Sequence, residues 1–226
     1  MKRIVDLHCD TVSTAMARGI DFKNESLNIN IYNGKDLEKW YQVFAFWTSD
    51  KYEGKDGFEC FVAQKEWFLK NFDNSTNCTP IMAVEGGNIF GGDISRIEKL
   101  LDMFYITLTW SYDNELSGSS GGSGSGLTAF GKEVVKQMNK HNILVDVSHL
   151  SDAGFKDLCS LTDYPFIASH SNCRSITNNP RNLTDDQIKE FIAREGLIGL
   201  NFYDAFVGKD KNDLKKHIDH FLELGA

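Results

Sequence analysis

The sequence contains no apolar run that approaches the roughly 20 residues needed by a membrane-spanning helix. No secretory signal is predicted, because the apolar segment after Lys2 and Arg3 is only a few residues long and ends in His8 and Asp10. Positive charge is scarce, since 24 Lys and Arg stand against 32 Asp and Glu and give a formal net charge of −8. These absences argue against a membrane protein, and against nucleic acid or an anionic membrane as the main partner.

Cysteines are few and show no pairing pattern. The chain has five of them, an odd number, and none forms a C-x-x-C motif. This usage argues against a disulfide framework and fits free thiols in a reducing compartment, so we expect a cytoplasmic protein. Cys9 lies between His8 and Asp10 on a predicted strand and should therefore face away from them and pack in the core.

What the chain does contain is a regular alternation of apolar and amphipathic segments. With 226 residues and 41% hydrophobic content, it can bury the core of one large α/β domain. The predicted strands cover residues 4–7, 41–47, 80–85, 105–110, 143–149, 165–170 and 196–203. The predicted helices cover residues 11–19, 58–72, 94–103, 128–140, 152–161, 185–194 and 214–224, with Ser151 and Thr184 as N-caps of two of them. Apolar strands separated by helices indicate a parallel sheet buried on both faces, and we predict a (β/α) barrel over residues 1–226 as a single domain.

Residues 117–126 consist only of Gly and Ser. Such a tract has little apolar surface to bury, so we expect it to form a flexible loop. Its composition is typical of an engineered linker that replaces a natural loop. A native low-complexity loop is the alternative.

Five side chains of metal-binding type lie where four predicted strands end. His8 and Asp10 are two residues apart on one strand and therefore project from the same face. Glu85, His149 and His170 end three later strands. Each has an ordinary structural explanation, but together they suffice for two divalent ions with one bridging carboxylate and a water between the metals.

These residues belong to longer motifs that resemble the membrane (renal) dipeptidase family, the zinc peptidase family M19, and in particular its bacterial members. The matching segments follow the family's order almost from end to end: Asp6-Leu7-His8-Cys9-Asp10-Thr11, Val84-Glu85-Gly86, Leu108-Thr109-Trp110, Gly126-Leu127-Thr128-Ala129-Phe130-Gly131-Lys132, Asp146-Val147-Ser148-His149, Ala168-Ser169-His170-Ser171-Asn172, Pro180-Arg181-Asn182-Leu183-Thr184-Asp185-Asp186 and Asn201-Phe202-Tyr203. The resemblance implies a TIM-like barrel of the metal-dependent hydrolase type.

The resemblance also implies a role for each matched residue. His8 and Asp10 would bind one zinc ion and His149 and His170 a second, with Glu85 as the bridging ligand, which gives two Zn²⁺ per chain. The expected reaction is hydrolysis of a dipeptide by hydroxide bound between the two metals. The relatives form homodimers, so a homodimer is expected here.

Three other positions relate to the substrate in this family. Arg181 would hold the terminal carboxylate of the dipeptide, for which a guanidinium fork is well shaped, and Tyr203 would lie near the substrate. A surface salt bridge is the alternative interpretation of Arg181, and a core position that of Tyr203. Trp110 stands where the animal enzymes carry a substrate-contacting histidine, so that contact cannot be transferred. His141, His217 and His220 are predicted at solvent-facing helix positions without a role.

Two departures from the family pattern are expected to matter. The family's eighth strand carries an aspartate that handles the proton of the attacking water, and the sequence ends before such a strand. We therefore expect an incomplete, C-terminally truncated barrel with two open edges, impaired by loss of a general base worth about 10²–10⁴-fold in rate. The Gly/Ser tract is the second departure, because it replaces the loop after the fourth strand.

Two alternatives compete with the dipeptidase. One is another amidohydrolase-type metal hydrolase acting on a lactone or phosphotriester; these commonly carry His-x-His on the first strand and a carbamylated lysine as the bridge, in place of the His-x-Asp and Glu85 found here. The other is a catalytically silent barrel that serves as a binding or scaffold protein. The missing aspartate favours this second alternative, and the complete ligand set argues against it.

Overall fold

The chain forms a single curled sheet of seven parallel strands. The structure is a computed structural model that describes residues 2–30, 34, 36–49, 55–74, 76–210 and 212–226. The strands pair in sequence order and every ladder is parallel. They are β1 (Arg3–Asp6), β2 (Lys39–Trp47), β3 (Cys78–Glu85), β4 (Tyr105–Thr107), β5 (Leu144–Asp146), β6 (Ile167–Ala168) and β7 (Leu197–Ile198).

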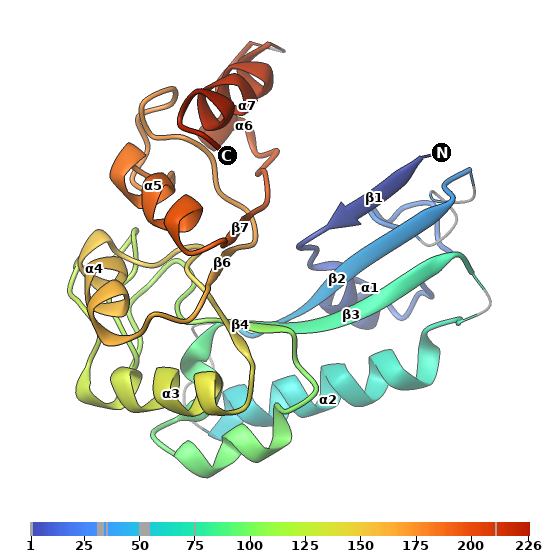
Figure 1. The fold of residues 1–226 in the computed structure, drawn as a ribbon. Helices are drawn as coiled ribbons and strands as arrows, with labels where there is room; N and C mark the ends of the chain where they lie inside the picture. Colours follow the sequence, from blue (N-terminus) through green and yellow to red (C-terminus); the bar gives the residue numbers. More distant parts are fainter. Residues whose placement is uncertain (1, 31–33, 35, 50–54, 75, 211) are drawn as a thin grey trace.

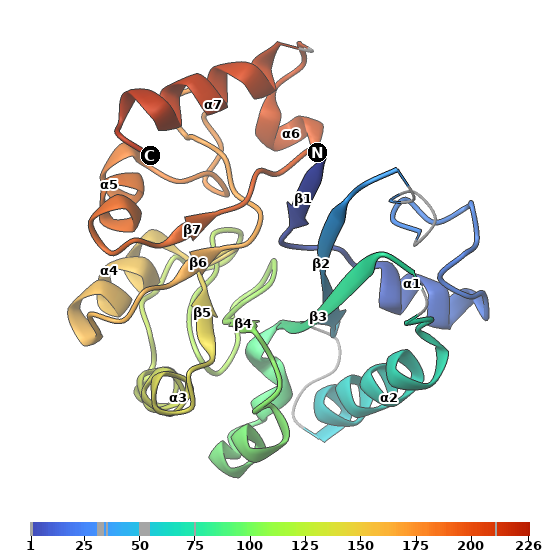
Figure 2. The ribbon, with the colours of Figure 1, turned by 45° about the vertical axis from the view of Figure 1, so that its right-hand side comes forward.

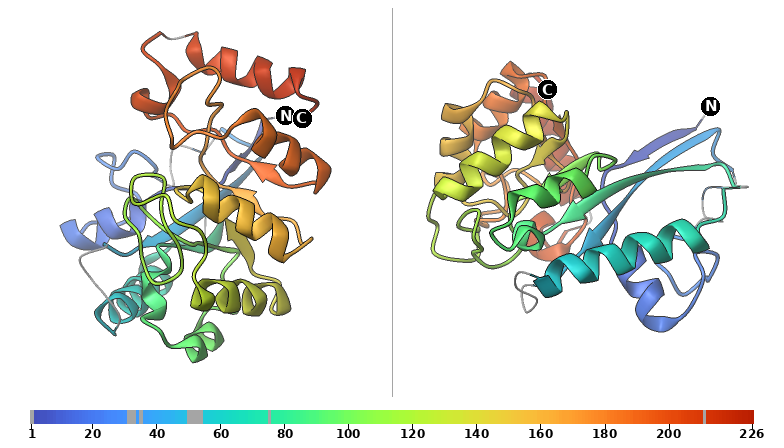
Figure 3. Two further views of the ribbon diagram at one scale, coloured as in Figure 1. Left: turned by 90° about the vertical axis from the view of Figure 1, so that its left-hand side faces the viewer. Right: turned by 90° about the horizontal axis from the view of Figure 1, so that it is seen from below.

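Helices cover the outside of the curled sheet (Figures 1 and 2). They are α1 (Thr11–Arg18), α2 (Lys55–Asn71), the 3₁₀ helices η1 (Gly87–Phe90) and η2 (Ile94–Lys99), α3 (Ala129–Lys140), α4 (Asp152–Leu161), α5 (Asp185–Ala193), α6 (Asp204–Val207) and α7 (Asp213–Glu223). Figure 3 shows α1 and α2 on the same side of β2 and β3. Parallel strands inside and helices outside confirm the predicted (β/α) barrel.

The barrel is open between its first and last strands. Within the described residues, no hydrogen-bonded ladder joins β7 to β1, and Figure 2 shows the gap between them. Three large apolar side chains on these two edges are exposed: Ile4 (46%), Val5 (60%) and Leu197 (49%). The predicted incomplete barrel with two open edges is thus confirmed.

Helix boundaries largely follow the capping residues. The hydroxyl of Ser151 accepts from the N–H of Gly154, and Thr184 forms a full capping box with Gln187. Residues 94–103 differ from the prediction, because only Ile94–Lys99 is helical and the helix is 3₁₀. The buried side chains there, Ile97, Leu100 and Met103, recur every three residues, which is the period of a 3₁₀ helix.

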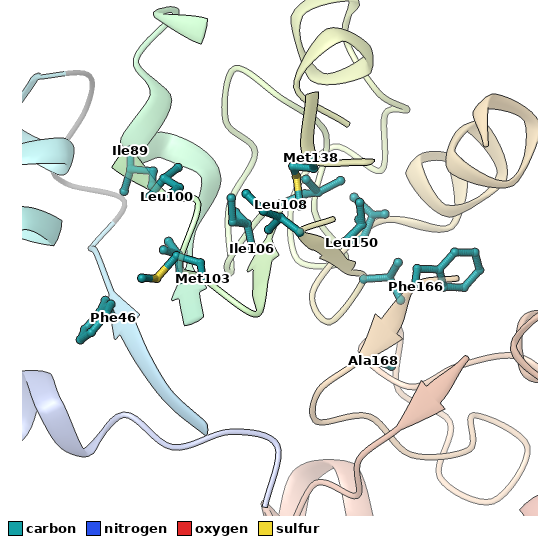
Figure 4. Packing of buried hydrophobic residues seen from close by; sticks show 14 of the residues in the cluster. Phe46, Ile89, Leu100, Met103, Ile106, Leu108, Met138, Leu150, Phe166 and Ala168 are labelled. Atoms are coloured by element: carbon teal, nitrogen blue, oxygen red, sulfur yellow. The ribbon is translucent and has the colours of Figure 1, made fainter. Parts of the chain in front are cut away.

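Two apolar layers fill the molecule. The larger lies between the sheet and the helices, and Figure 4 shows the part of it around β4 to β6. Cys9 belongs to this layer, which confirms its predicted packing role. A smaller inner cluster is formed by Leu7, Val43, Ala83, Tyr105 and Ile167. Its members come from β2, β3, β4 and β6 and from the residue that follows β1.

The Gly/Ser tract lies in a loop that turns around the carboxylate of Asp113, which accepts hydrogen bonds from the N–H groups of Ser119 (2.8 Å) and Ser123 (3.1 Å). A side chain on Gly122 would overlap Asp113, and one on Gly126 would overlap Asp157. This close fit favours a native loop over an inserted linker. Its mobility stays a prediction.

Candidate active site

The carboxyl ends of the strands bring the five predicted ligands together. The Nε2 atom of His8 lies 3.4 Å from Oδ1 of Asp10, and the Nε2 atoms of His149 and His170 lie 3.1 Å apart. Glu85 lies between these two pairs. These are the two pairs that the family resemblance assigns to separate ions.

Glu85 presents one carboxylate oxygen to each pair. Its Oε2 lies 3.6 Å from Nε2 of His8. Its Oε1 lies 3.3 Å from Nε2 of His149 and 3.6 Å from Nε2 of His170. The side chain is 2% exposed, so a carboxylate is held in the interior with a different set of imidazoles at each oxygen.

The donor set fits divalent metal ions. Two ligand atoms on a tetrahedral zinc at about 2.0–2.1 Å are separated by roughly 3.3–3.4 Å, and the separations here run from 3.1 to 3.6 Å. His8, Glu85 and His170 all have a ligand atom within 4.8 Å of one another. Imidazole nitrogen with carboxylate oxygen is a set that zinc, manganese, iron and cobalt accept.

The titratable groups at the site influence one another strongly. Burial by itself would raise the pKa of Glu85, but the imidazoles of His8 and His149 outweigh it and hold that pKa well below its usual range. Burial would lower the pKa of His8, but Tyr105 and Glu85 raise it well above the usual value. Desolvation and the Glu85 carboxylate raise the pKa of Asp10.

The other two imidazoles are shifted the opposite way. Burial, and then the positive charge of Arg181, lowers the pKa of His149 to about 4. The pKa of His170 is also well below its usual value, because of burial and of the charge at His8. These two rings are therefore neutral near pH 7, which is the form that ligates metals.

A hydroxyl group inside the barrel orients His8. The phenol of Tyr105 is buried and donates to the carbonyl of Leu7 (2.9 Å). Its oxygen is then left to accept from Nδ1–H of His8 (2.8 Å). This arrangement directs Nε2 of His8 toward Asp10 and Glu85.

The loop after the fourth strand reaches the site through His149. This residue has a φ of 70°, in the left-handed region that non-glycine residues rarely adopt. The N–H of Ser120 donates to its carbonyl (2.8 Å). The Gly/Ser loop thus helps to hold a strand-end histidine in a strained backbone conformation.

Arg181 is buried close to the ligands. Its Nη1 donates to Ser171 Oγ (2.9 Å) and its Nη2 to the carbonyl of His170 (3.1 Å), while the buried Nε has no hydrogen-bond partner. Within the described part of the chain, no carboxylate forms an ion pair with it, and burial lowers its pKa to about 10. The surface salt-bridge interpretation of Arg181 is therefore wrong.

Arg174 fixes the loop that carries Arg181. Its guanidinium donates to the carbonyls of Pro180 (2.9 Å) and Asn182 (2.8 Å), on either side of Arg181. It also pairs through two hydrogen bonds of 2.7 and 2.8 Å with Asp152 on α4. The loop is thereby attached to the outer helices.

A cavity of about 990 Å³ connects the ligand cluster with the opening between β1 and β7. All five ligands line it, and so do Trp110, Tyr203 and Phe206. Tyr203 is 64% exposed and packs edge-on against Phe206, so the core interpretation of Tyr203 is wrong. Arg181 lies behind this wall, with its guanidinium 5.7 Å from the ring of Phe206.

His217 corrects another prediction. It was expected to face solvent, but it is fully buried. Its Nδ1 accepts from the N–H of Cys173 (3.1 Å) and its Nε2–H donates to the carbonyl of Val207 (2.8 Å). His217 thus joins α7 to the loop after β6, through partners that helix periodicity does not reveal.

The sequence predictions also missed the polar groups behind the ligands. Tyr105, Asp146 and Ser169 are all buried next to the cluster. The hydroxyl oxygen of Tyr105 lies 2.8 Å from Nδ1 of His8. That of Ser169 lies 2.7 Å from Nδ1 of His170 and 2.7 Å from Oδ2 of Asp146. Asp146 and Ser169 belong to two of the motif segments matched in the sequence, which is a signal that could have indicated them.

A model of the family described as membrane dipeptidase (peptidase family M19) matches residues 61–225. An uncharacterised dipeptidase of Schizosaccharomyces pombe is 34% identical over 174 residues, which cover 73% of this chain and 42% of that protein. An uncharacterised protein from the pqqA 5′ region of Klebsiella pneumoniae is 34% identical over 162 residues, 62% of this chain and 58% of that protein. The chain thus spans about half the length of these curated relatives.

A solved structure shows the same fold. It is the crystal structure of a metallopeptidase from Rhodobacter sphaeroides, liganded with a phosphinate mimic of the dipeptide L-Ala-D-Ala. The TM-score is 0.85 at 21% identity, and the match covers 98% of this chain and 82% of that one. No helix in the described part of the chain is long and apolar enough to cross a membrane.

Proposed function

The chain belongs to the membrane dipeptidase family, peptidase family M19, and from this premise we propose that it hydrolyses the peptide bond of dipeptides with two zinc ions. The observation that carries the proposal is the placement of Glu85 between two groups of ligands, with one oxygen facing each. A bridging carboxylate needs this arrangement, and an isolated structural carboxylate does not.

Each ligand has a distinct part in the proposed site. His8 and Asp10 would hold one ion, His149 and His170 the other, and Glu85 both. Such a pair of ions supplies hydroxide near neutral pH and polarises the carbonyl under attack. The low pKa of Glu85 and the neutral imidazoles of His149 and His170 keep their metal-binding forms available at that pH.

The substrate would lie in the 990 Å³ cavity. We assign its terminal carboxylate to Arg181, because a buried guanidinium with a free Nε and no carboxylate partner among the described residues favours an incoming anion. Tyr203, exposed on the cavity wall, would contact the dipeptide from the other side. The bound ligand of the Rhodobacter sphaeroides protein makes L-Ala-D-Ala the first substrate to test.

The metal-hydrolase alternative with a carbamylated lysine receives no support from the site, since the side chain that lies between the two ligand pairs is that of Glu85. A reducing, cytoplasmic location and a homodimer stay predictions. The free thiols of all five cysteines fit the first of them.

Hydrolysis of a small dipeptide tests the proposal directly. We expect the purified protein, supplied with Zn²⁺, to release free amino acids from L-Ala-D-Ala or L-Ala-L-Ala, and to lose that activity after chelation and regain it with metal. Release would be followed by chromatography of the amino acids. Zinc binding without any release would favour the silent scaffold, and activity that survives complete removal of metal would contradict the proposal.

A further inference from the structure

Behind His170 lies a buried carboxylate that the proposed reaction does not use. Asp146, at the end of β5, is fully buried. Its Oδ1 accepts from the N–H groups of Ser148 (3.0 Å) and Ser169 (2.8 Å). Its Oδ2 accepts from the hydroxyls of Thr107 (2.6 Å) and Ser169 (2.7 Å).

These contacts fix the direction of the Ser169 hydroxyl. An ionised carboxylate only accepts hydrogen bonds, so the single hydrogen of Ser169 Oγ points at Asp146. Two uncharged acceptors compete for this hydrogen, Ser148 Oγ at 3.3 Å and Nδ1 of His170 at 2.7 Å, and a charge-assisted bond to the carboxylate is stronger than either. The oxygen of Ser169 is then left with acceptor capacity only.

The Nδ1 atom of His170 lies 2.7 Å from Ser169 Oγ and forms a hydrogen bond with it. Since that oxygen has no hydrogen left to give, Nδ1 must carry the proton and donate it. Its Nε2 then has a free lone pair, and this is the atom that lies 3.6 Å from Glu85 Oε1. The position of the proton on His170 thus depends on a chain of two hydrogen bonds, through Ser169 to Asp146.

We propose that Asp146, acting through Ser169, is a positioning residue that fixes His170 in the tautomer whose Nε2 is free to bind metal. The inference rests on the proposed metal site. It adds a residue that no ligand pattern identifies, because Asp146 is not a proposed ligand and is not among the residues that line the cavity.

Asp146→Asn tests the proposal, because it should reverse the direction of the hydrogen bonds that link residue 146, Ser169 and His170. Asn keeps the size of the side chain and can still accept the two backbone N–H groups through its oxygen. The amide nitrogen, in place of Oδ2, would donate to Ser169 Oγ, whose hydrogen would turn to Nδ1 of His170 and move the imidazole proton to Nε2. Nitrogen-15 NMR of the histidine rings in the metal-free protein reads this tautomer directly.

We expect Nδ1–H in the wild-type protein and Nε2–H in Asp146→Asn, with zinc affinity lowered about 10–100-fold, as for other outer-shell partners. Thr107→Val is the matched control, because it removes a hydrogen bond to the same carboxylate oxygen without touching Ser169. It should keep the wild-type tautomer and zinc affinity. If Asp146→Asn does not fold, Ser169→Ala is expected to abolish the preference for Nδ1–H and to lower zinc affinity about 10-fold.

Nε2–H in the wild-type protein, or an unchanged tautomer of His170 in Asp146→Asn, would overturn the inference. So would a loss of zinc affinity in Thr107→Val equal to that in Asp146→Asn, which would mark Asp146 as a packing residue. The NMR measurement needs neither metal nor turnover. A protein that shows the expected tautomers and binds no zinc would therefore contradict the proposed function, but it would not contradict the role of Asp146 in fixing the tautomer of His170.

Discussion

Glu85→Gln is expected to reduce dipeptide hydrolysis by at least about 100-fold, because loss of an outer-shell partner already costs about 10–100-fold and Glu85 is a proposed ligand of both ions. The amide keeps the shape of the side chain, but only one of its two ends can ligate a metal. The oxygens that face His8 on one side and His149 on the other would no longer be equivalent. The measurement is kcat/KM for the hydrolysed dipeptide, together with zinc content per chain.

Glu115→Gln is the control for this change. Glu115 accepts from the N–H of Gly91 (2.7 Å) and does not line the cavity, so its conversion to an amide should leave kcat/KM and zinc content unchanged. If Glu85→Gln hydrolyses the dipeptide as fast as the wild-type protein, Glu85 does not bridge two ions and the dinuclear account is wrong.

Arg181→Met is expected to raise KM about 10–100-fold with a smaller change in kcat. A hydrogen bond to a charged group contributes about 1.5–3 kcal/mol, and one to a non-reacting terminal carboxylate stabilises bound substrate and transition state alike. A dipeptide amide, which lacks that carboxylate, should be a poor substrate of the wild-type protein and be affected little by the substitution. Steady-state kinetics with both substrates measures the difference.

Arg194→Met is the control for Arg181→Met and distinguishes a role in substrate binding from a role in stability. Arg194 also donates to main-chain carbonyls, those of Cys159 and Thr162, and lies over a phenylalanine ring, that of Phe166. Arg181 donates to the carbonyl of the proposed ligand His170, whereas these contacts of Arg194 involve no proposed ligand, so the loss of Arg194 should affect stability without changing KM. An Arg181→Met variant that loses stability as much as Arg194→Met and shows an unaltered KM would assign Arg181 a structural role.

The barrel and the cluster of ligands could be predicted from the sequence for one physical reason. Parallel strands joined by helices place all their carboxyl ends at one face of the sheet, so His8, Glu85, His149 and His170 had to converge once the strands were identified. Strand alternation predicted that Asp10 and His8 share one face, but β1 ends at Asp6 and Asp10 is the N-cap of α1, so their 3.4 Å contact comes from the segment between these two elements. Capping residues such as Ser151 and Thr184 fixed helix starts because their hydrogen bonds are local.

What could not be predicted depends on contacts between distant segments. The burial of His217 requires Cys173 and Val207 as partners, and helix periodicity carries no information about either. The burial of Arg181 depends on the loop that carries it, which Arg174 holds through the carbonyls of Pro180 and Asn182. The direction of the Ser169 hydroxyl depends on Asp146 from a neighbouring strand, and no spacing in the sequence encodes it.

The central claim is that the strand ends assemble a site for two metal ions, and metal content tests it most directly. Elemental analysis after gel filtration in Zn²⁺-containing buffer, with free metal removed and no chelator present, should find about two zinc ions per chain, as a bridging carboxylate with two ligand pairs requires. Glu85→Gln should retain fewer than the wild-type protein. A wild-type chain that is folded and binds no zinc would contradict the account, because all five proposed ligands lie within the described residues.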